Sequence, residues 1–259
     1  MRLMINHQTH FQYSETACNS IQYIKMMPVS NAHQKVHHWN ISVPGDWQQQ
    51  MDVFHNPWLT AVQRYSYSQM TIMVQGVIEL NPSTGQGPQC SLNPFIFLQP
   101  TAMTQSDAEM RCFAHRYVRE NTVDQLKQLA QALLQYMPYK VQATSVCTSA
   151  IEAFQRREGV CQDHSHVFIA MCKALGIPAR YVSGYLFADN STHLASHAWA
   201  EAYLNDTWYC FDISNQIFSP QVHVYVATGR DYWDVAPIRG VREKGGTETM
   251  QSIVQVLTC

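Results

Sequence analysis

The chain has 259 residues, of which 46% are hydrophobic and 14% are charged. This length allows one large domain or two ordinary ones, and the composition is that of a folded globular protein, which excludes an intrinsically disordered chain. The formal net charge is −2, and no run of Lys or Arg is present. We therefore expect neither nucleic acid nor an anionic membrane surface as a partner.

The N-terminal segment and the spacing of the cysteines indicate in which cellular compartment we expect the protein. Residues 1–15 contain no apolar segment of signal-peptide length, and no later window reaches the roughly 18 uninterrupted apolar residues of a membrane helix. The eight cysteines are scattered and form no CxxC pair. A chain of this size needs no disulfide framework, so we expect a cytoplasmic protein whose thiols are mostly buried packing residues.

The first hundred residues show the period of two that is typical of strands. Apolar and polar residues alternate in Lys35–Val43 and in Met70–Leu80. Chain breakers such as Pro44-Gly45 and the segment Asn81–Pro94 separate such runs. This rhythm predicts an N-terminal antiparallel β-sandwich domain over residues 1–100.

The period changes after residue 100, where we predict a second domain over residues 101–259 that includes the C-terminal strands. Composition and spacing predict helices at Asp107–Val118, Val123–Tyr136, about Thr148–Arg157 and Cys161–Leu175. Strands are expected at Arg180–Phe187, His197–Leu204, Thr207–Ser214 and His223–Ala227. Gly159 suits the left-handed exit residue of the third helix. The fold class is therefore α+β.

Cys161, His197 and Asp212 combine into a candidate site. A helix start supplies unpaired N–H groups that stabilise a thiolate at Cys161. His197, at the start of a strand, offers an imidazole that can hold this anion and protonate a leaving group. Asp212, on the next strand of a presumed hairpin, can lie beside His197 in register and fix its tautomer. These residues predict a Cys161–His197–Asp212 catalytic triad.

Each of the three residues has a simpler interpretation when it is taken alone. A lone Cys usually packs in a core, a lone His on a strand is usually a hydrogen-bonded packing residue, and Asp before Ser often shapes a turn. We favour the triad because the three fall together on one helix start and two adjacent strands.

The motifs around these residues resemble the core of the transglutaminase-like superfamily, in a bacterial branch described as candidate cysteine proteases. Four motifs carry the resemblance: Gly159-Val160-Cys161-Gln162-Asp163, Gly176–Tyr185, His197-Ala198-Trp199-Ala200-Glu201 and Phe211-Asp212. Further segments are similar to the N-terminal β domain, the interdomain segment and the tail of this branch: Asp52–Asn56, Phe97–Thr101, Gly229–Tyr232 with Asp234–Pro237, and Arg239-Gly240.

The resemblance implies a papain-like core in which helices pack on an antiparallel sheet. It implies Cys161 as nucleophile, His197 as base and acid, and Asp212 as the orienting carboxylate. Two departures stand out. The usual Asp-Pro-Thr-Asn becomes Asp212-Ile213-Ser214-Asn215, which leaves the carboxylate intact but affects the strand exit, and the Gly of the N-terminal motif becomes His55.

Three further residues have open interpretations. Beside the backbone N–H of Cys161, Gln155 is an oxyanion donor by analogy with papain, although a residue on the preceding helix is more often simply solvated. Trp199 either walls the cleft or packs in the core. Asp163 favours the first helical turn through the helix dipole.

A metal site is the less favoured interpretation of the histidines. His164 and His166 lie two residues apart on a predicted helix and so face different directions. His193 lies in the expected loop 188–195, away from His197. This spacing does not suit one shared set of ligands, and no EF-hand loop is visible. We expect no metal and no cofactor.

The leading functional hypothesis is acyl transfer through a Cys161 thioester, on a protein or peptide substrate. Hydrolysis by a cysteine protease or amidase and the alternative, cross-linking by a transglutaminase, share the first half-reaction. The resemblance to the bacterial branch favours hydrolysis. A non-catalytic peptide-binding module on the same scaffold is a third hypothesis. Nothing in the sequence indicates an oligomeric state.

Overall fold

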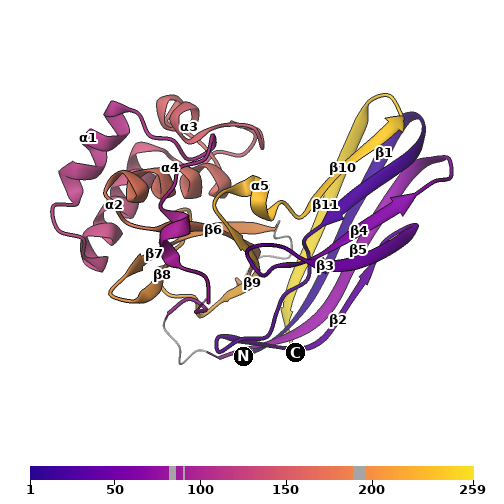
Figure 1. Cartoon of the computed structure of the whole chain (residues 1–259), viewed down its shortest axis with the longest axis horizontal. Helices are drawn as coiled ribbons and strands as arrows, with labels where there is room; N and C mark the ends of the chain where they lie inside the picture. The colour runs from indigo at the N-terminus through magenta and orange to yellow at the C-terminus, as the bar shows by residue number, and fades with distance from the viewer. Residues whose placement is uncertain (82–85, 90, 189–195) are drawn as a thin grey trace.

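Two antiparallel sheets and a group of helices organise the chain (Figure 1). The computed structural model describes residues 1–81, 86–89, 91–188 and 196–259. The helices and the four-stranded sheet lie to the left in Figure 1, and the long strands of the seven-stranded sheet lie to the right. Among the described residues, no helix has both the length and the apolar character needed to cross a bilayer.

The seven-stranded sheet is built around one long strand. Its members are β1 (Arg2–Ile24), β2 (Gln34–Ser42), β3 (Asp46–Met51), β4 (Pro57–Gln63), β5 (Tyr67–Leu80), β10 (Ile238–Lys244) and β11 (Glu248–Thr258). On one side β1 pairs with β4 and β5, and on the other with β10 and β11, always antiparallel. The predicted strands Lys35–Val43 and Met70–Leu80 correspond to β2 and β5.

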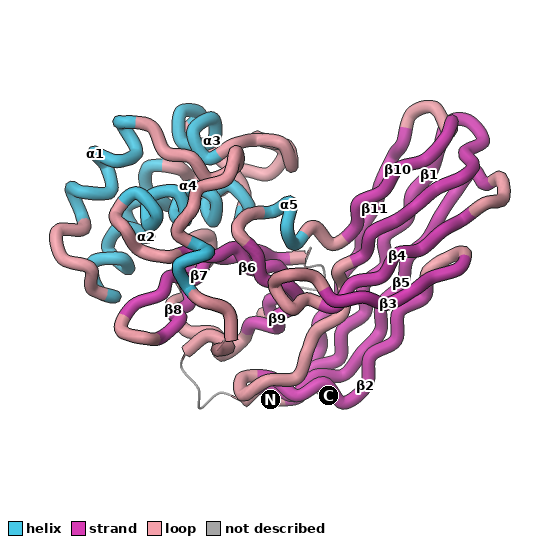
Figure 2. The backbone as a smooth tube through the Cα atoms, in the orientation of Figure 1, coloured by secondary structure: helices cyan, strands magenta, loops and turns pink. Residues whose placement is uncertain are grey.

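This sheet is one curled layer rather than the predicted sandwich of two sheets (Figure 2). The strands β5 and β11 pair with the first half of β1, whereas β4 and β10 pair with its second half. The neighbours therefore follow β1 along its whole length, so no edge divides the sheet in two. Leu59 of β4 and Ile72 of β5 share one buried cluster, which the curl encloses.

The C-terminal strands return to the first sheet. We expected residues 101–259 to form one core that includes them, but β10 and β11 pair with β1. The domain boundary near residue 100 stays a prediction. The last two strands lie in the sheet of the N-terminal segment, on the other side of that boundary.

The second unit packs helices on a four-stranded sheet. Its helices are η2 (Pro94–Phe97, a 3-10 turn), α1 (Ala108–Tyr117), α2 (Val123–Tyr136), α3 (Ala150–Arg156), α4 (Cys161–Ala174) and α5 (Tyr232–Val235). Its strands are β6 (Ala179–Leu186), β7 (His197–Leu204), β8 (Thr207–Phe211) and β9 (His223–Gly229), in the order β8-β7-β6-β9. The four helices and four strands predicted after residue 100 are confirmed, with ends that differ by a few residues.

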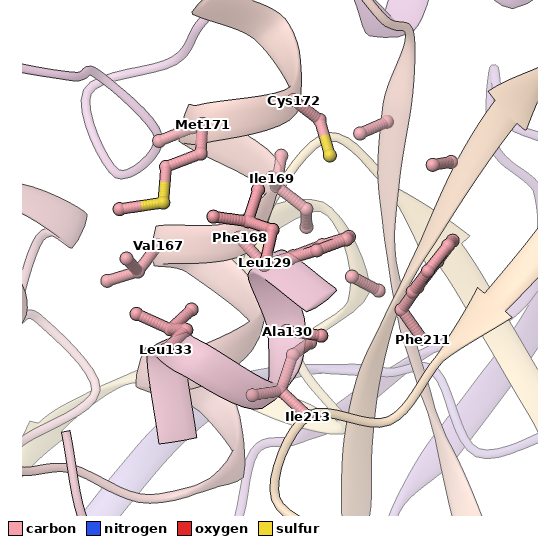
Figure 3. Close-up of a cluster of buried hydrophobic side chains, with 14 of the residues drawn as sticks. Leu129, Ala130, Leu133, Val167, Phe168, Ile169, Met171, Cys172, Phe211 and Ile213 are labelled. Carbon is pink, nitrogen blue, oxygen red and sulfur yellow. The ribbon is translucent and has the colours of Figure 1, made fainter. Parts of the chain in front are cut away.

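The helix α4 forms the centre of this unit. Its Val167, Phe168 and Met171 join Leu129 and Leu133 of α2 in one apolar cluster (Figure 3). Burial of a large apolar side chain stabilises a fold by about 1.5–3 kcal/mol. The sequence pattern predicted one apolar face, but α4 is buried from residue 162 to 173, polar side chains included. The first residue of this rigid helix, Cys161, is therefore firmly placed.

The connection between α3 and α4 depends on a close backbone approach. We predicted Gly159 as the left-handed exit residue, but Arg157 takes that conformation, with φ 56°. Gly159 is needed for another reason, because a Cβ there would lie 2.7 Å from Cβ of Asp163. A glycine at this position lets the chain enter α4 directly beside Asp163.

Side chains from the first sheet region cover the free edge of β9. Gln34 accepts from Tyr225 N and donates to Tyr225 O, both at 2.8 Å. Asn56 likewise accepts from Thr228 N at 2.9 Å and donates to Thr228 O at 2.8 Å. Paired amides of this kind satisfy an edge strand that water or another chain would otherwise bind. They also dock the two sheets together.

His55 occupies a position where the family motif has glycine. Its φ is 65°, in the left-handed region that favours glycine. The turn nevertheless forms, because Asp52 Oδ1 accepts from the backbone N–H groups of Phe54 and Asn56, each at 2.8 Å. The departure from the motif therefore leaves the turn intact.

Candidate active site

Cys161 lies at the start of α4, as predicted. The N-cap residue is Val160, which makes no side-chain cap bond, so the first-turn N–H groups remain available on that side. Asp163 Oδ2 accepts from Val160 N at 2.8 Å and from Thr144 Oγ1 at 2.6 Å. Burial raises the pKa of Asp163. Asp163 therefore shapes the entry into the helix, beyond the dipole effect that we expected.

His197 is the first residue of β7 and its side chain is 11% exposed. Its Nε2 donates to Asp212 Oδ2 at 2.7 Å. Burial alone lowers the pKa of His197, but hydrogen bonds to Asp212 and to the Cys161 thiol outweigh it and raise the pKa to about 10. The imidazole therefore favours its charged form around neutral pH, in contact with both partners.

Asp212 directly follows β8 and is fully buried. Besides His197, its Oδ2 accepts from His223 Nε2 at 3.1 Å and from Asn215 Nδ2 at 2.9 Å. Burial raises the pKa of Asp212, but the hydrogen bonds from His197 and His223 more than offset this and hold it well below its usual range. The carboxylate is thus ionised and held in one orientation.

The β7–β8 register explains how Asp212 reaches His197. Ala200 pairs with Phe211, so the two antiparallel strands place Asp212 across from Trp199 rather than directly beside His197. His197 and Asp212 are therefore diagonal neighbours, which side chains of this length can bridge. The predicted proximity is present, but the direct cross-strand pairing was wrong by two residues.

Cys161 and His197 open onto one pocket of about 600 Å³. Aromatic and aliphatic side chains form much of its wall, together with uncharged polar groups. The described lining residues are Tyr139, Val160, Cys161, Gln162, Tyr181, Ser183, Leu186, Ser196, His197, Ala198, Ser214, Asn215, Tyr232 and Pro237. Lys, Arg, Asp and Glu are absent from this set, so apart from the charged His197 imidazole the described wall binds a substrate by shape and hydrogen bonding.

Two further residues had open interpretations. Gln155 is exposed, donates to Asp107 Oδ2 at 3.4 Å and does not line the pocket, which agrees with the solvated interpretation rather than with the oxyanion role. Trp199 is fully buried and packs beside His197, with ring centroids 6.0 Å apart. It belongs to the core behind the site rather than to the cleft wall.

The histidines considered for a metal site have separate partners. His164 Nε2 donates to Met137 O at 2.7 Å, and its Nδ1 lies 2.9 Å from Ser214 Oγ. His166 Nε2 accepts from Tyr232 N at 3.0 Å, and burial lowers the pKa of His166 to about 3. His193 lies outside the described residues. His164 and His166 therefore have structural hydrogen-bonding roles.

Among the described residues, His197, Asp212 and His223 carry donor atoms within 4.8 Å of one another, a spacing that suits a metal ion. The two distances from Nε2 to Asp212 Oδ2 are nevertheless 2.7 Å and 3.1 Å. These are hydrogen-bond lengths. Each imidazole therefore donates a hydrogen bond to the ionised Asp212 carboxylate.

The sequence prediction missed two partners of Asp212. Asn215 was detectable, because an Asp that accepts from a backbone N–H three residues later is a common turn, here at 3.2 Å. His223 was not, since it begins a strand that pairs with β6 and has no sequence relationship to Asp212. Only the folded sheet brings it to the carboxylate.

Two families match the chain. Residues 113–213 match the transglutaminase-like superfamily, and residues 3–79 match the bacterial transglutaminase-like N-terminal region. The first match includes Cys161, His197 and Asp212, and the second covers most of the curled sheet. Between them the two families account for most of the chain, in the order that the motifs predicted.

Similar proteins align over nearly the full length. An uncharacterised protein of Mycobacterium leprae is 27% identical, over 98% of this chain and 98% of its own. One of Mycobacterium tuberculosis is 26% identical, over 93% of this chain and 87% of its own. The crystal structure of a "Putative Cysteine Protease" from Cytophaga hutchinsonii matches with a TM-score of 0.79 and 23% identity, over 99% and 90% of the two chains. This last likeness establishes the fold.

Proposed function

We propose that this chain, which matches the transglutaminase-like superfamily over residues 113–213, is a thiol hydrolase of amide bonds with a Cys161–His197–Asp212 triad. One observation carries the proposal: Cys161 and His197 share a pocket wall while His197 Nε2 lies 2.7 Å from the buried Asp212 carboxylate. An imidazole held between a thiol and a carboxylate is the arrangement that thiol-based acyl transfer needs.

The reaction begins with the Cys161 thiolate attacking the amide carbonyl carbon. The carbonyl oxygen becomes an oxyanion, which the backbone N–H groups at the start of α4 stabilise. The His197 imidazolium then protonates the departing amine as the C–N bond breaks, which leaves a thioester on Cys161 and a neutral imidazole. Water, deprotonated by His197, attacks this thioester and releases the acid and the thiolate.

Hydrolysis is favoured over cross-linking by the chemistry of the pocket wall. A transglutaminase must bind a lysine side chain as the second substrate, and a carboxylate near the thioester would attract its ammonium group. The described lining residues include no Asp or Glu. We therefore propose a peptide or glutamine amide as the substrate and water as the acyl acceptor. Because the scattered cysteines form no CxxC pair, we also propose that the protein works in the cytoplasm.

A substrate screen tests this function. Peptides and glutamine-containing donors are incubated with the protein, with and without a primary amine, and cleavage, ammonia release and amine incorporation are measured. We expect cleavage or ammonia release, reduced about 10³-fold or more by Cys161→Ala because the nucleophile is lost. Cys112→Ala, at an exposed thiol on α1, is the matched control and should have no effect.

Three outcomes of this screen contradict the proposal in different ways. Undiminished turnover by Cys161→Ala removes Cys161 as nucleophile. Amine incorporation in place of hydrolysis supports the cross-linking alternative. Tight peptide binding with no turnover by either protein supports the non-catalytic binding module.

A further inference from the structure

Asp212 accepts hydrogen bonds from two imidazoles, and the triad uses only one of them. His223, the first residue of β9, is fully buried, and its Nε2 lies 3.1 Å from Asp212 Oδ2. His197 Nε2 lies 2.7 Å from the same oxygen. His223 does not line the pocket, so it cannot touch a substrate there.

The surroundings of His223 fix its position and its tautomer. His33 Nε2 donates to the backbone oxygen of His223 at 2.9 Å, and Trp199 packs on its ring with centroids 4.7 Å apart. Nδ1 of His223 has no hydrogen-bond partner among the described residues. The ring proton therefore lies on Nε2, where the Asp212 carboxylate accepts it.

Several titratable groups surround this ring. Burial lowers the pKa of His223, and the nearby charge of His197 lowers it further. The hydrogen bond to Asp212 and the charges of Asp212 and Glu201 raise it without offsetting the burial. His33 is itself held below its usual pKa, chiefly by burial. His223 is therefore a neutral donor that adds no positive charge beside His197.

A neutral donor matters because the His197–Asp212 pair is buried. Removed from water, a carboxylate and an imidazolium can relieve the cost of burial by moving the proton onto the carboxylate. The two groups are then neutral, and His197 no longer stabilises a thiolate at Cys161. Each hydrogen bond that Asp212 accepts makes it a weaker base and so opposes this transfer.

We propose that His223 is a positioning residue that keeps Asp212 ionised and the proton on His197, so that His197 can stabilise a thiolate at Cys161. This inference rests on the proposed function, because it concerns the same thiol. His223 acts on Cys161 only through Asp212 and His197.

Two variants distinguish the effect of the His223–Asp212 hydrogen bond from the effect of packing against Trp199. His223→Phe keeps an aromatic ring against Trp199 but removes the donor, whereas His223→Gln retains an N–H donor at similar reach. The readout is the rate of Cys161 alkylation by iodoacetamide at pH 6, divided by that of the exposed Cys112 in the same molecule, measured by peptide mass spectrometry. A hydrogen bond to a charged group is stronger than a neutral one. We therefore expect the relative alkylation rate of Cys161 to fall about tenfold or more in His223→Phe, and less than about threefold in His223→Gln.

A double-variant cycle tests whether His223 acts through Asp212. Asp212→Asn alone should slow Cys161 alkylation, and adding His223→Phe to it should then have no further effect. The proposal is overturned if His223→Phe reacts like the wild type. It is also overturned if Phe and Gln slow alkylation equally, or if the His223→Phe loss persists in the Asp212→Asn background.

A spectroscopic measurement on the wild type keeps the proposal testable if His223→Phe does not fold. In 15N-histidine-labelled protein, His223 should be neutral at pH 7.5, with its proton on Nε2. A charged His223, or a proton on Nδ1, overturns the proposal. If wild-type Cys161 reacts no faster than Cys112, the proposed function fails instead, and these spectra alone decide the role of His223.

Discussion

The buried histidines of this protein differ in the direction of their net pKa shift. Burial lowers the pKa of His7 to about 4 and that of His166 to about 3, because neither ring has a carboxylate partner. His197 is also buried, yet Asp212 and Cys161 raise its pKa to about 10. For these three rings, the hydrogen-bond partners rather than the depth decide which one is charged at neutral pH.

The buried neutral histidines predict acid sensitivity. A histidine whose folded pKa is lowered binds its proton only on unfolding, so stability falls as pH drops below about 6.5 and continues to fall towards the folded pKa. At pH 5 we expect His7 and His166 each to reduce the free energy of unfolding by about 2 kcal/mol. Urea denaturation at pH 7.5 and pH 5 measures this loss.

The variant His166→Gln provides the matched control for this prediction. Its amide oxygen can still accept from Tyr232 N, but the side chain does not titrate. The stability loss between pH 7.5 and pH 5 should therefore shrink by about 2 kcal/mol. An unchanged loss in this variant would mean that His166 does not stay neutral in the folded protein.

At the residue scale, the sequence predicted the candidate site residues whose side-chain chemistry and order along the chain both suit a catalytic triad. Cys161 at a helix start and His197 at a strand start lie where the pattern placed them, whereas Asp212 follows its strand and lies diagonally from His197 instead of directly beside it. His223 could not be predicted, because its contact with Asp212 depends on how β9 joins the sheet.

At the element scale, the start of α4 depends on the close packing of Gly159 against Asp163. A methyl group at residue 159 would meet the Asp163 side chain 2.7 Å away, so one of them must move. We expect Gly159→Ala to reduce the free energy of unfolding by about 1–3 kcal/mol. Because Cys161 follows two residues later, its alkylation rate should also fall.

The neighbouring variant Glu158→Ala serves as the control for Gly159→Ala. Glu158 pairs with Lys140 at an exposed position, so its loss should change stability by less than about 0.5 kcal/mol. Chemical denaturation of both variants gives the comparison. Equal stabilities would show that the approach of residue 159 to Asp163 does not constrain the helix start.

The elements differ in how well sequence patterns predicted them. The segment from α1 to β9 combines strong periods with clear breakers, and its helices and strands were predicted. The strand β1 was not, because His7 and Thr9 occupy inward positions and interrupt the apolar alternation. Buried polar residues of this kind are satisfied only by long-range contacts, such as that of His7 Nδ1 with the Tyr185 hydroxyl at 3.0 Å.

At the scale of the whole molecule, the two sheets are joined by buried polar contacts and a shared apolar cluster. Leu3 and Ile5 of β1 pack with Val224 and Val226 of β9 in that cluster. Lys25 also bonds to Asp52 at 2.6 Å and to the backbone oxygen of Asp234, beside the pocket wall. The first sheet therefore supports the wall of the pocket that contains Cys161 and His197, although the sequence pattern separated the two units at residue 100.

This connection predicts a single cooperative unfolding transition in calorimetry. Asn56→Ala removes both hydrogen bonds to Thr228 and leaves these backbone groups unpaired at the β9 edge. We expect a loss of about 1–3 kcal/mol and a broader or divided transition. Asn40→Ala, at an exposed position of β2, should leave the transition unchanged. Two separate transitions in the wild type would contradict this prediction.

The central claim is that Cys161 is a nucleophile activated by His197, and site-resolved alkylation tests it without knowledge of the substrate. Wild-type protein is treated with iodoacetamide between pH 5 and pH 9, and Cys161 and Cys112 are followed in the same sample. We predict that Cys161 reacts about tenfold or more faster than Cys112 at pH 6, and that His197→Ala abolishes the difference. Equal rates for the two thiols at pH 6, in the wild type, would contradict the claim.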